Sequence, residues 1–143
     1  MGDAGEGAAA RAYFAGDRVA GGLGMELVSA GPGRAVVRMA VTAAMLNGHG
    51  TAHGGHLFLL ADTAFACACN SHGPLTVAAG AAIEFLAPAR EGDVLVAEAE
   101  ERHRAGRGGL YDVRVRRGAT VVAEFRGRAR TPRPPTSTPD ITS

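Results

Sequence analysis

Lysine is absent from the sequence, and all 15 cationic side chains are arginines. Schiff-base catalysis and other mechanisms that need a lysine amine are therefore excluded. The net charge is only +1, and the chain lacks the basic stripe, the interleaved aromatic residues and the paired Cys/His ligands of nucleic-acid-binding modules. No nucleic-acid partner is expected.

Cysteine is scarce as well. The sequence holds two, Cys67 and Cys69, and residues two apart on a helix point in different directions. They can form neither a disulfide framework nor a metal ribbon. We interpret both as small apolar groups buried in a protein of a reducing compartment.

Long hydrophobic runs are also missing. The longest run, Leu57 to Cys69, is interrupted by Asp62 and Thr63 and is shorter than the ~20 residues that a membrane-spanning helix needs. The N-terminal segment is acidic where a signal peptide would be basic. The sequence therefore predicts a soluble, cytoplasmic protein with no membrane partner.

The composition of the chain suits one compact domain. With 143 residues, 46% of them hydrophobic, the chain can bury one core and has little left for a second. Residues 1–7 are predicted to be a flexible N-terminus and residues 8–131 the domain. Residues 132–143 are proline-rich with few aliphatic side chains, which predicts a disordered tail.

Hydrophobic patterning and turn residues place the expected elements. A short amphipathic helix is expected over 8–19, broken by Gly21-Gly22, and a long helix over 54–70 that is apolar on every side. Six strands are predicted, the first two as a hairpin and the last four as an antiparallel meander: 23–30, 34–41, 76–86, 94–104, 110–117 and 120–130. This order predicts an α+β architecture, an antiparallel sheet wrapped around one long central helix.

One carboxylate, Asp62, lies in the middle of the apolar helix. Burying it without a partner would be costly. One interpretation is a structural acid that backbone donors or an arginine satisfy. The other is a functional acid placed where chemistry needs it.

The segment before the helix, residues 47–55, holds four glycines, a composition that suits a loop approaching a ligand. Backbone N–H groups at the helix start, around Gly54 and Gly55, would point along the axis with the positive end of its dipole. Such donors can stabilise the oxyanion of a reacting carbonyl. The alternative is that these glycines only let the loop turn into the helix.

Eight residues separate Gly54 from Asp62, which is about 12 Å along a helix. One carbonyl group cannot touch both. If both act on the same carbonyl group, they must come from two chains whose central helices run antiparallel, so the spacing predicts a twofold dimer with two composite sites.

Three histidines have the i, i+4, i+7 spacing of a metal-binding helix face: His49, His53 and His56. The glycines around them argue against a helix there, and no cysteine or carboxylate nearby completes a ligand set. We predict no metal and no cofactor.

A group of motifs carries a specific resemblance to a known family. The motifs are Asn47, His49-Gly50, His53-Gly54-Gly55, Leu60 to Ala66, Asn70-Ser71 and Ile83 to Pro88. With the predicted layout, they make residues 8–131 similar to hotdog-fold acyl-CoA thioesterases. Within that family, the chain resembles the phenylacetyl-CoA thioesterases of aerobic phenylacetate degradation, the PaaI type.

The resemblance implies a hotdog fold and an enzyme that hydrolyses aryl-acetyl-CoA thioesters at a dimer interface, with dimers pairing into a homotetramer. It implies that Asp62 is the catalytic carboxylate, that the Gly54 N–H polarises the thioester carbonyl, and that the Asn47 amide assists at the same oxygen. His53 would order the loop or the thioester. Whether Asp62 attacks directly or orients a water stays open, and we favour the water.

Further substrate contacts are predicted at Gly55, Thr63 and Arg107. Arg107 stands with other arginines near predicted strand ends, where guanidinium groups could meet the phosphates of coenzyme A. A hydroxyl that assists the acid in the family has only an approximate counterpart here, Thr76, because Ala78 and Ala79 lie closest to the expected position.

Two other functions compete with hydrolysis. Hotdog hydratases or dehydratases pair an acid with a histidine five residues later, and this chain has Cys67 there. An acyl-CoA-binding or regulatory module would keep the fold without turnover, although the retained Asp62, Asn47, His53 and Gly54 argue against such a loss. Free thiol release separates both functions from hydrolysis.

Overall fold

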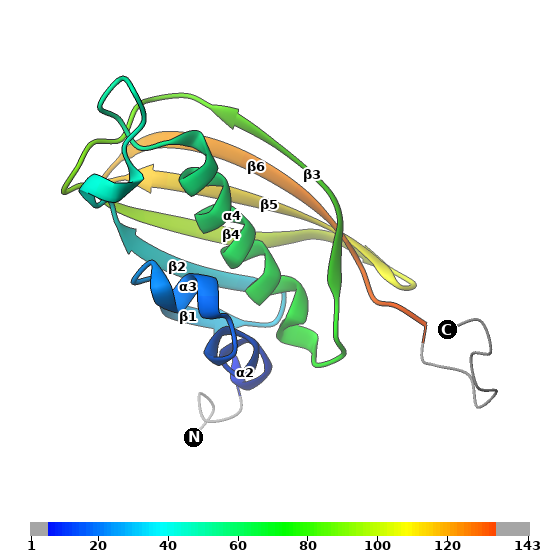
Figure 1. Ribbon diagram of the computed structural model, residues 1–143. Helices are drawn as coiled ribbons and strands as arrows, with labels where there is room; N and C mark the ends of the chain where they lie inside the picture. The colour runs from blue at the N-terminus through cyan, green and yellow to red at the C-terminus, as the bar shows by residue number, and fades with distance from the viewer. Residues whose placement is uncertain (1–5, 134–143) are drawn as a thin grey trace, which may run out of the picture.

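The computed structural model of the protein describes residues 6–133 and shows an antiparallel sheet curved around one long helix (Figure 1). The helices are α2 (Ala8–Ala15), α3 (Arg18–Gly22), α4 (Gly54–Cys69) and the short 3-10 helices η1 (Ala43–Met45) and η2 (Asn70–His72). The strands are β1 (Glu26–Gly31), β2 (Arg34–Ala40), β3 (Val77–Phe85), β4 (Val94–Ala105), β5 (Gly108–Arg117) and β6 (Thr120–Arg130). The predicted α+β hotdog architecture is confirmed. The flexible N-terminus and the disordered tail lie mostly outside the described residues and stay predictions.

The strands follow the order β1-β2-β4-β5-β6-β3. The meander predicted for the last four strands is therefore wrong for β3, which pairs with β6 instead of β4. β4 already has β2 and β5 as its two neighbours, so the chain leaving α4 can join the sheet only at an outer edge. This position leaves β3 as an edge strand.

α4 lies across the concave face of the sheet. Its Phe65 ring packs edge-on against Tyr111, with ring centroids 5.6 Å apart, and sits above Gly127 of β6, where an added Cβ would come within 2.7 Å of the ring. Tyr111, Val113 and Val115 of β5 are buried while the residues between them face outward, as the alternating pattern predicts.

The central helix is not enclosed on every side, contrary to the prediction. One strip along it is exposed or only partly covered in the single chain: Gly55 is exposed, and Leu59, Asp62 and Ala66 are partly covered. These residues are three or four positions apart and so share one helix face. In the single chain, therefore, the apolar helix keeps one face that the rest of the fold does not fully cover.

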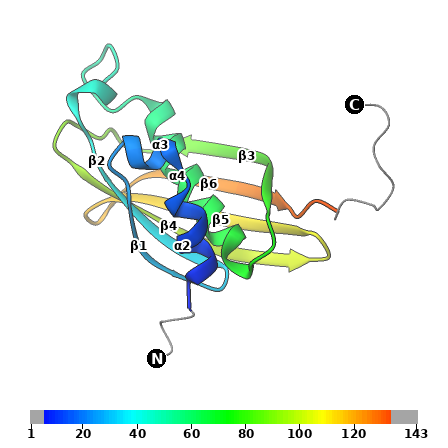
Figure 2. The same ribbon diagram turned by 60° about the horizontal axis from the view of Figure 1, so that its bottom comes forward.

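The N-terminal helix is also divided differently from the prediction. The break falls at Gly16, where α2 ends, and Gly21-Gly22 continue α3 instead of breaking it. Asp17 starts α3 as its N-cap, because its Oδ1 accepts a hydrogen bond of 3.0 Å from the Ala20 N–H. Both helices lie beside α4 on the concave side of the sheet (Figure 2).

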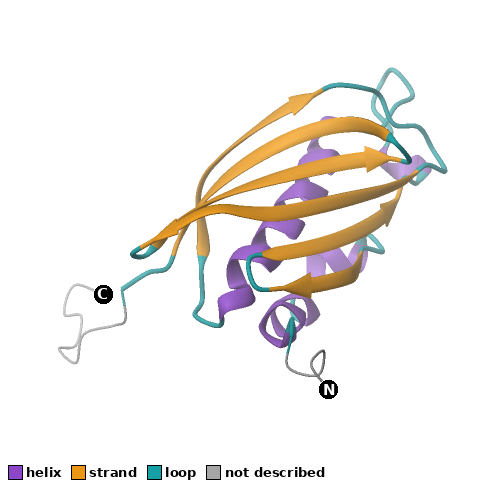
Figure 3. Cartoon of the chain, turned by 180° about the vertical axis from the view of Figure 1, so that it is seen from behind, coloured by secondary structure: helices purple, strands orange, loops and turns teal. Residues whose placement is uncertain are grey.

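Figure 3 shows the convex face of the sheet, on the side away from α4. Charged side chains of neighbouring strands form ion pairs on this face. Arginines and carboxylates of neighbouring strands meet at 2.6–2.8 Å in the pairs Arg38–Glu26, Arg102–Asp112, Arg114–Glu124, Arg116–Glu98 and Arg126–Asp112. Such exposed pairs add little stability individually. Within residues 6–133, no helix has both the length and the apolar character needed to cross a membrane.

Candidate active site

The loop before α4 is organised by one side chain, Asn47. Its Oδ1 accepts hydrogen bonds from the N–H groups of His49 and Thr51, at 2.9 and 3.2 Å, and from the Thr51 hydroxyl at 3.3 Å. Because all three partners are donors, the oxygen faces the loop and the NH₂ group faces away from it. That NH₂ group bonds to no described residue, so it is available to an acceptor.

At the start of α4, His53 forms a hydrogen bond with the backbone N–H of one of the two following glycines and not with that of the other. His53 is the N-cap residue, and its Nδ1 accepts a hydrogen bond of 2.9 Å from the Gly55 N–H. The Gly54 N–H, by contrast, donates to no acceptor in residues 6–133. The first helical N–H therefore remains unpaired at the positive end of the helix dipole.

Asn47 and Gly54 line the same open groove, with a volume of about 510 Å³. Its other lining residues are Thr51, Ala52, Leu57, Phe85, Leu86, Ala87 and Pro88. The Phe85 ring lies so close to Gly54 that a Cβ there would come within 2.9 Å of Cζ. The groove therefore combines two N–H donors with an apolar wall, an arrangement that can bind a carbonyl oxygen and stabilise developing negative charge.

Asp62 lies two turns further along α4 and is half-buried. No described residue donates a hydrogen bond to its carboxylate or forms an ion pair with it, so the structural interpretation finds no support in this part of the chain. Burial raises the pKa of Asp62, and the negative charge of Asp17 raises it further. A raised pKa makes a carboxylate a stronger base.

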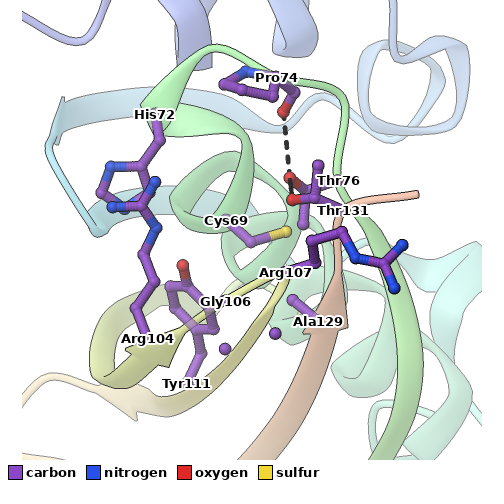
Figure 4. Close-up of a pocket in the computed structure, with 12 residues that line it drawn as sticks. Cys69, His72, Pro74, Thr76, Arg104, Gly106, Arg107, Tyr111, Ala129 and Thr131 are labelled. Carbon is purple, nitrogen blue, oxygen red and sulfur yellow. Dashed lines mark hydrogen bonds between the residues drawn. The ribbon is translucent and has the colours of Figure 1, made fainter. Parts of the chain in front are cut away.

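The other predicted contacts differ in availability. The Gly55 N–H is already bonded to His53, and the buried Thr63 hydroxyl donates to the Leu59 carbonyl at 2.8 Å. Arg107 lies in the turn between β4 and β5, next to the C-terminal end of α4, whereas Asn47 and Gly54 are at its N-terminal end (Figures 1 and 4). The chain thus brings Asn47, His53 and Gly54 together and holds Arg107 apart from them.

The two cysteines, Thr76 and the histidine group are the remaining candidates from the sequence, and the described structure gives none of them a catalytic or metal-binding arrangement. Burial raises the pKa of Cys67 and of Cys69 to about 12, so both thiols stay protonated at neutral pH. The Thr76 hydroxyl bonds to the Pro74 carbonyl and to the Thr131 hydroxyl. The metal-binding face that the histidine spacing would form does not exist, since α4 begins only at Gly54, and residues 6–133 contain no cluster of three metal-ligating side chains.

Two residues near the site were not predicted from sequence. Phe85 is the last residue of β3 and Asp17 is the N-cap of α3, and only the tertiary fold brings them beside α4. Asp17 lies inside the single helix expected over 8–19, so neither its N-cap role nor its charge beside Asp62 was predicted.

Comparisons with known proteins agree with this site. Residues 49–124 match the family model of the thioesterase superfamily. The acyl-coenzyme A thioesterase PaaI of Escherichia coli K12 is 49% identical over 121 residues, covering 84% of this chain and 86% of that protein.

Solved structures give the same relationship. The E. coli PaaI protein from the phenylacetic acid degradation operon superposes with a TM-score of 0.85 at 46% identity, covering 87% of this chain and 91% of that one. A hypothetical thioesterase from Streptococcus pneumoniae TIGR4, solved with coenzyme A, has a TM-score of 0.73 at 27% identity and covers 76% of this chain and 85% of that one. The chain therefore belongs to the thioesterase superfamily, as a thioester hydrolase of the hotdog fold that resembles the PaaI acyl-CoA thioesterases.

Proposed function

We propose that the protein hydrolyses aryl-acetyl-CoA thioesters, such as phenylacetyl-CoA and its ring-hydroxylated derivatives, at two composite sites of a twofold dimer. The observation that carries this proposal is the separation of two unpaired groups on one helix. The Gly54 N–H and the Asp62 carboxylate both lack partners in the described chain, and they lie too far apart along α4 to act on one carbonyl.

In each composite site, the Gly54 N–H and the Asn47 NH₂ of one subunit bind the thioester oxygen. Asp62 of the other subunit takes a proton from a water molecule while the water oxygen attacks the carbonyl carbon. The oxyanion forms against the two donors and the helix dipole. Its collapse breaks the C–S bond, and Asp62 returns the proton to the departing sulfur, which gives a free acid and the thiol of CoA.

Two exposed features support pairing of the chains. β3 is an edge strand of low charge, with Val77 and Phe85 respectively 44% and 54% exposed; such an edge invites pairing with another strand. The partly covered strip on α4 flanks Asp62. In a dimer whose twofold axis runs between two β3 strands, each chain would cover both features of the other. The two central helices would then lie together in antiparallel directions.

The substrate class rests on the relatives. The E. coli relative is named for acyl-CoA thioester hydrolysis and its structure for phenylacetic acid degradation, and the S. pneumoniae structure contains coenzyme A. Assembly of dimers into a homotetramer and a cytoplasmic location are further parts of the proposal.

A thiol-trapping assay over a panel of aryl-acetyl- and alkyl-CoA substrates tests the function. We expect stoichiometric release of CoA, fastest with the aryl-acetyl substrates. A hydratase or dehydratase would change the acyl chain and leave the thioester intact. An acyl-CoA-binding module would bind the panel without releasing thiol, and either outcome would overturn the proposal.

The pH dependence of kcat/KM should reflect the environment of Asp62. The carboxylate form is the base, so activity falls as the pH decreases through the Asp62 pKa, and the raised pKa places this loss at a higher pH than for an ordinary aspartate. Asp17→Asn removes the neighbouring charge and should move the acidic limb to lower pH. Asparagine is an equally good N-cap, so the melting temperature should stay unchanged; an unmoved limb would contradict the assigned role of Asp62 as the base.

A further inference from the structure

The position of the Asp62 carboxylate depends on how α4 rests on the sheet. In the described part of the chain, no residue donates a hydrogen bond to this carboxylate or pairs with its charge, so no direct contact holds it in place. At its N-terminal end, α4 is tied to the preceding loop through the N-cap residue His53. The contacts at its C-terminal end therefore decide where Asp62 lies.

At that end, one carboxylate oxygen accepts two hydrogen bonds: Oε1 of Glu101, in β4. His72 Nε2 lies 2.7 Å from this oxygen, and the Tyr111 hydroxyl donates to it at 2.9 Å. His72 belongs to η2, which follows α4 directly, and Tyr111 belongs to β5. Both side chains line a cavity beside Cys69, the last residue of α4 (Figure 4). Glu101 thus links the segment that leaves α4 to the sheet.

Tyr111 extends this link to the helix itself. Its ring packs against Phe65 of α4, and Phe65 follows Asp62 by three residues, so the two are neighbours on the helix surface. The Phe65 ring is buried above Gly127 of β6. Because Glu101 holds the Tyr111 hydroxyl, it also holds the ring against which this part of α4 rests.

A second set of hydrogen bonds starts from the backbone of the same residue. The Glu101 N–H donates to the Gly33 carbonyl at 2.7 Å, and the Gly33 N–H donates to the Ser71 hydroxyl at 2.8 Å. The Ser71 hydroxyl donates in turn to the Ala68 carbonyl of α4 at 2.6 Å. Gly33 has a φ of +72°, and a Cβ there would come within 2.9 Å of the Glu101 Cβ, so this close contact requires glycine. Glu101 is therefore connected to the end of α4 through both its side chain and its backbone.

Glu101 is ionised at neutral pH. Burial alone would raise its pKa, but the hydrogen bonds from His72 and Tyr111 and the charges of His72 and Arg104 lower the pKa below the usual value of a glutamate. An ionised acceptor forms stronger hydrogen bonds than a neutral one. Both bonds go to Oε1, whereas Oε2 accepts none from residues 6–133.

We propose that Glu101 is a positioning residue for Asp62. By holding Tyr111 and His72, it fixes the C-terminal half of α4 on the sheet and so fixes the place of the carboxylate in the composite site. The inference rests on the proposed function, because it explains how that site keeps its base aligned. Misplacing a reacting group by about 1 Å can cost about 10²-fold in rate.

Glu101→Ala should lower kcat by about 10- to 100-fold and leave KM within about three-fold of the wild-type value, because the oxyanion donors lie at the other end of α4. Glu101→Gln should keep kcat near the wild-type value. Its amide oxygen can accept both hydrogen bonds, and its NH₂ group takes the place of Oε2. Glu98→Ala is the matched control, since Glu98 lies on the same strand but pairs with Arg116 on the convex face; it should change neither constant.

A double-mutant cycle with Asp62→Asn distinguishes positioning from a general loss of structure. If Glu101 acts through Asp62, Glu101→Ala should lower kcat hardly further once Asp62 is replaced by asparagine. A damaged fold would instead lower kcat by the same factor in both backgrounds. Equal losses in the two backgrounds would therefore overturn the proposal.

Tyr111→Phe tests the same network with a smaller change and decides the question where Glu101→Ala does not fold. It removes only the hydroxyl and leaves the ring against Phe65, so kcat should fall by about 2- to 10-fold, the effect of one hydrogen bond. Wild-type kcat in this variant would overturn the positioning role. Failure of the proposed function looks different, because then the wild-type protein releases no thiol from any acyl-CoA.

Discussion

Asp62→Asn should lower kcat by about 10²- to 10⁴-fold, the range that general-base catalysis contributes. The amide has nearly the same shape as the carboxylate but cannot take a proton from water. No described residue donates a hydrogen bond to Asp62, so the substitution removes no contact within the chain. The melting temperature and the dissociation constant of an acyl-CoA should therefore stay close to the wild-type values while thiol release almost stops.

Asp17→Asn is the matched control for this experiment. It makes the same chemical change at the neighbouring carboxylate, whose Oδ1 caps α3. At neutral pH it should keep turnover near the wild-type value. Near-normal turnover of Asp62→Asn would refute the assignment of Asp62 as the base.

Gly54→Pro should lower kcat by about 10²- to 10³-fold, the cost of one missing oxyanion donor. Proline lacks the N–H and is favoured at the first position of a helix, which Gly54 occupies. The residue before a proline must be extended, and His53 already is, with φ −62° and ψ 136°. The backbone can thus accept the substitution while losing the unpaired Gly54 N–H.

Comparison with Gly54→Ala distinguishes the effect of the lost N–H on kcat from the effect of the added side-chain bulk. Both substitutions place a Cβ near the Phe85 ring, and Phe85 is 54% exposed and so can move aside. Alanine keeps the N–H. If alanine and proline lower kcat equally, crowding and not the lost donor explains the effect, and the oxyanion role of Gly54 is wrong.

The central helix and its acid could be predicted from the sequence because both signals are local. Glycines before an apolar run fix where α4 begins, and a single carboxylate in that run identifies Asp62. The motif around His53-Gly54-Gly55 also indicated the family. These features depend on neighbours in the chain, which the sequence shows directly.

Features that depend on tertiary pairing could not be predicted in the same way. The two adjacent glycines look equivalent until the His53 ring is seen to bond to the Gly55 N–H. The position of β3 depends on β2 occupying the free edge of β4. The contrast between paired Arg102 and unpaired Arg128 arises from strand register, because Asp112 lies within reach of one and not of the other.

The central claim is that each site takes its donor from one chain and its base from another. Co-expression of Asp62→Asn and Gly54→Pro chains with different affinity tags allows the mixed dimer to be purified. One of its two sites would then pair an intact Gly54 with an intact Asp62, so we expect about half of the wild-type kcat per dimer. If the mixed dimer releases thiol no faster than the two parent variants, donor and base act within a single chain, and the composite site is wrong.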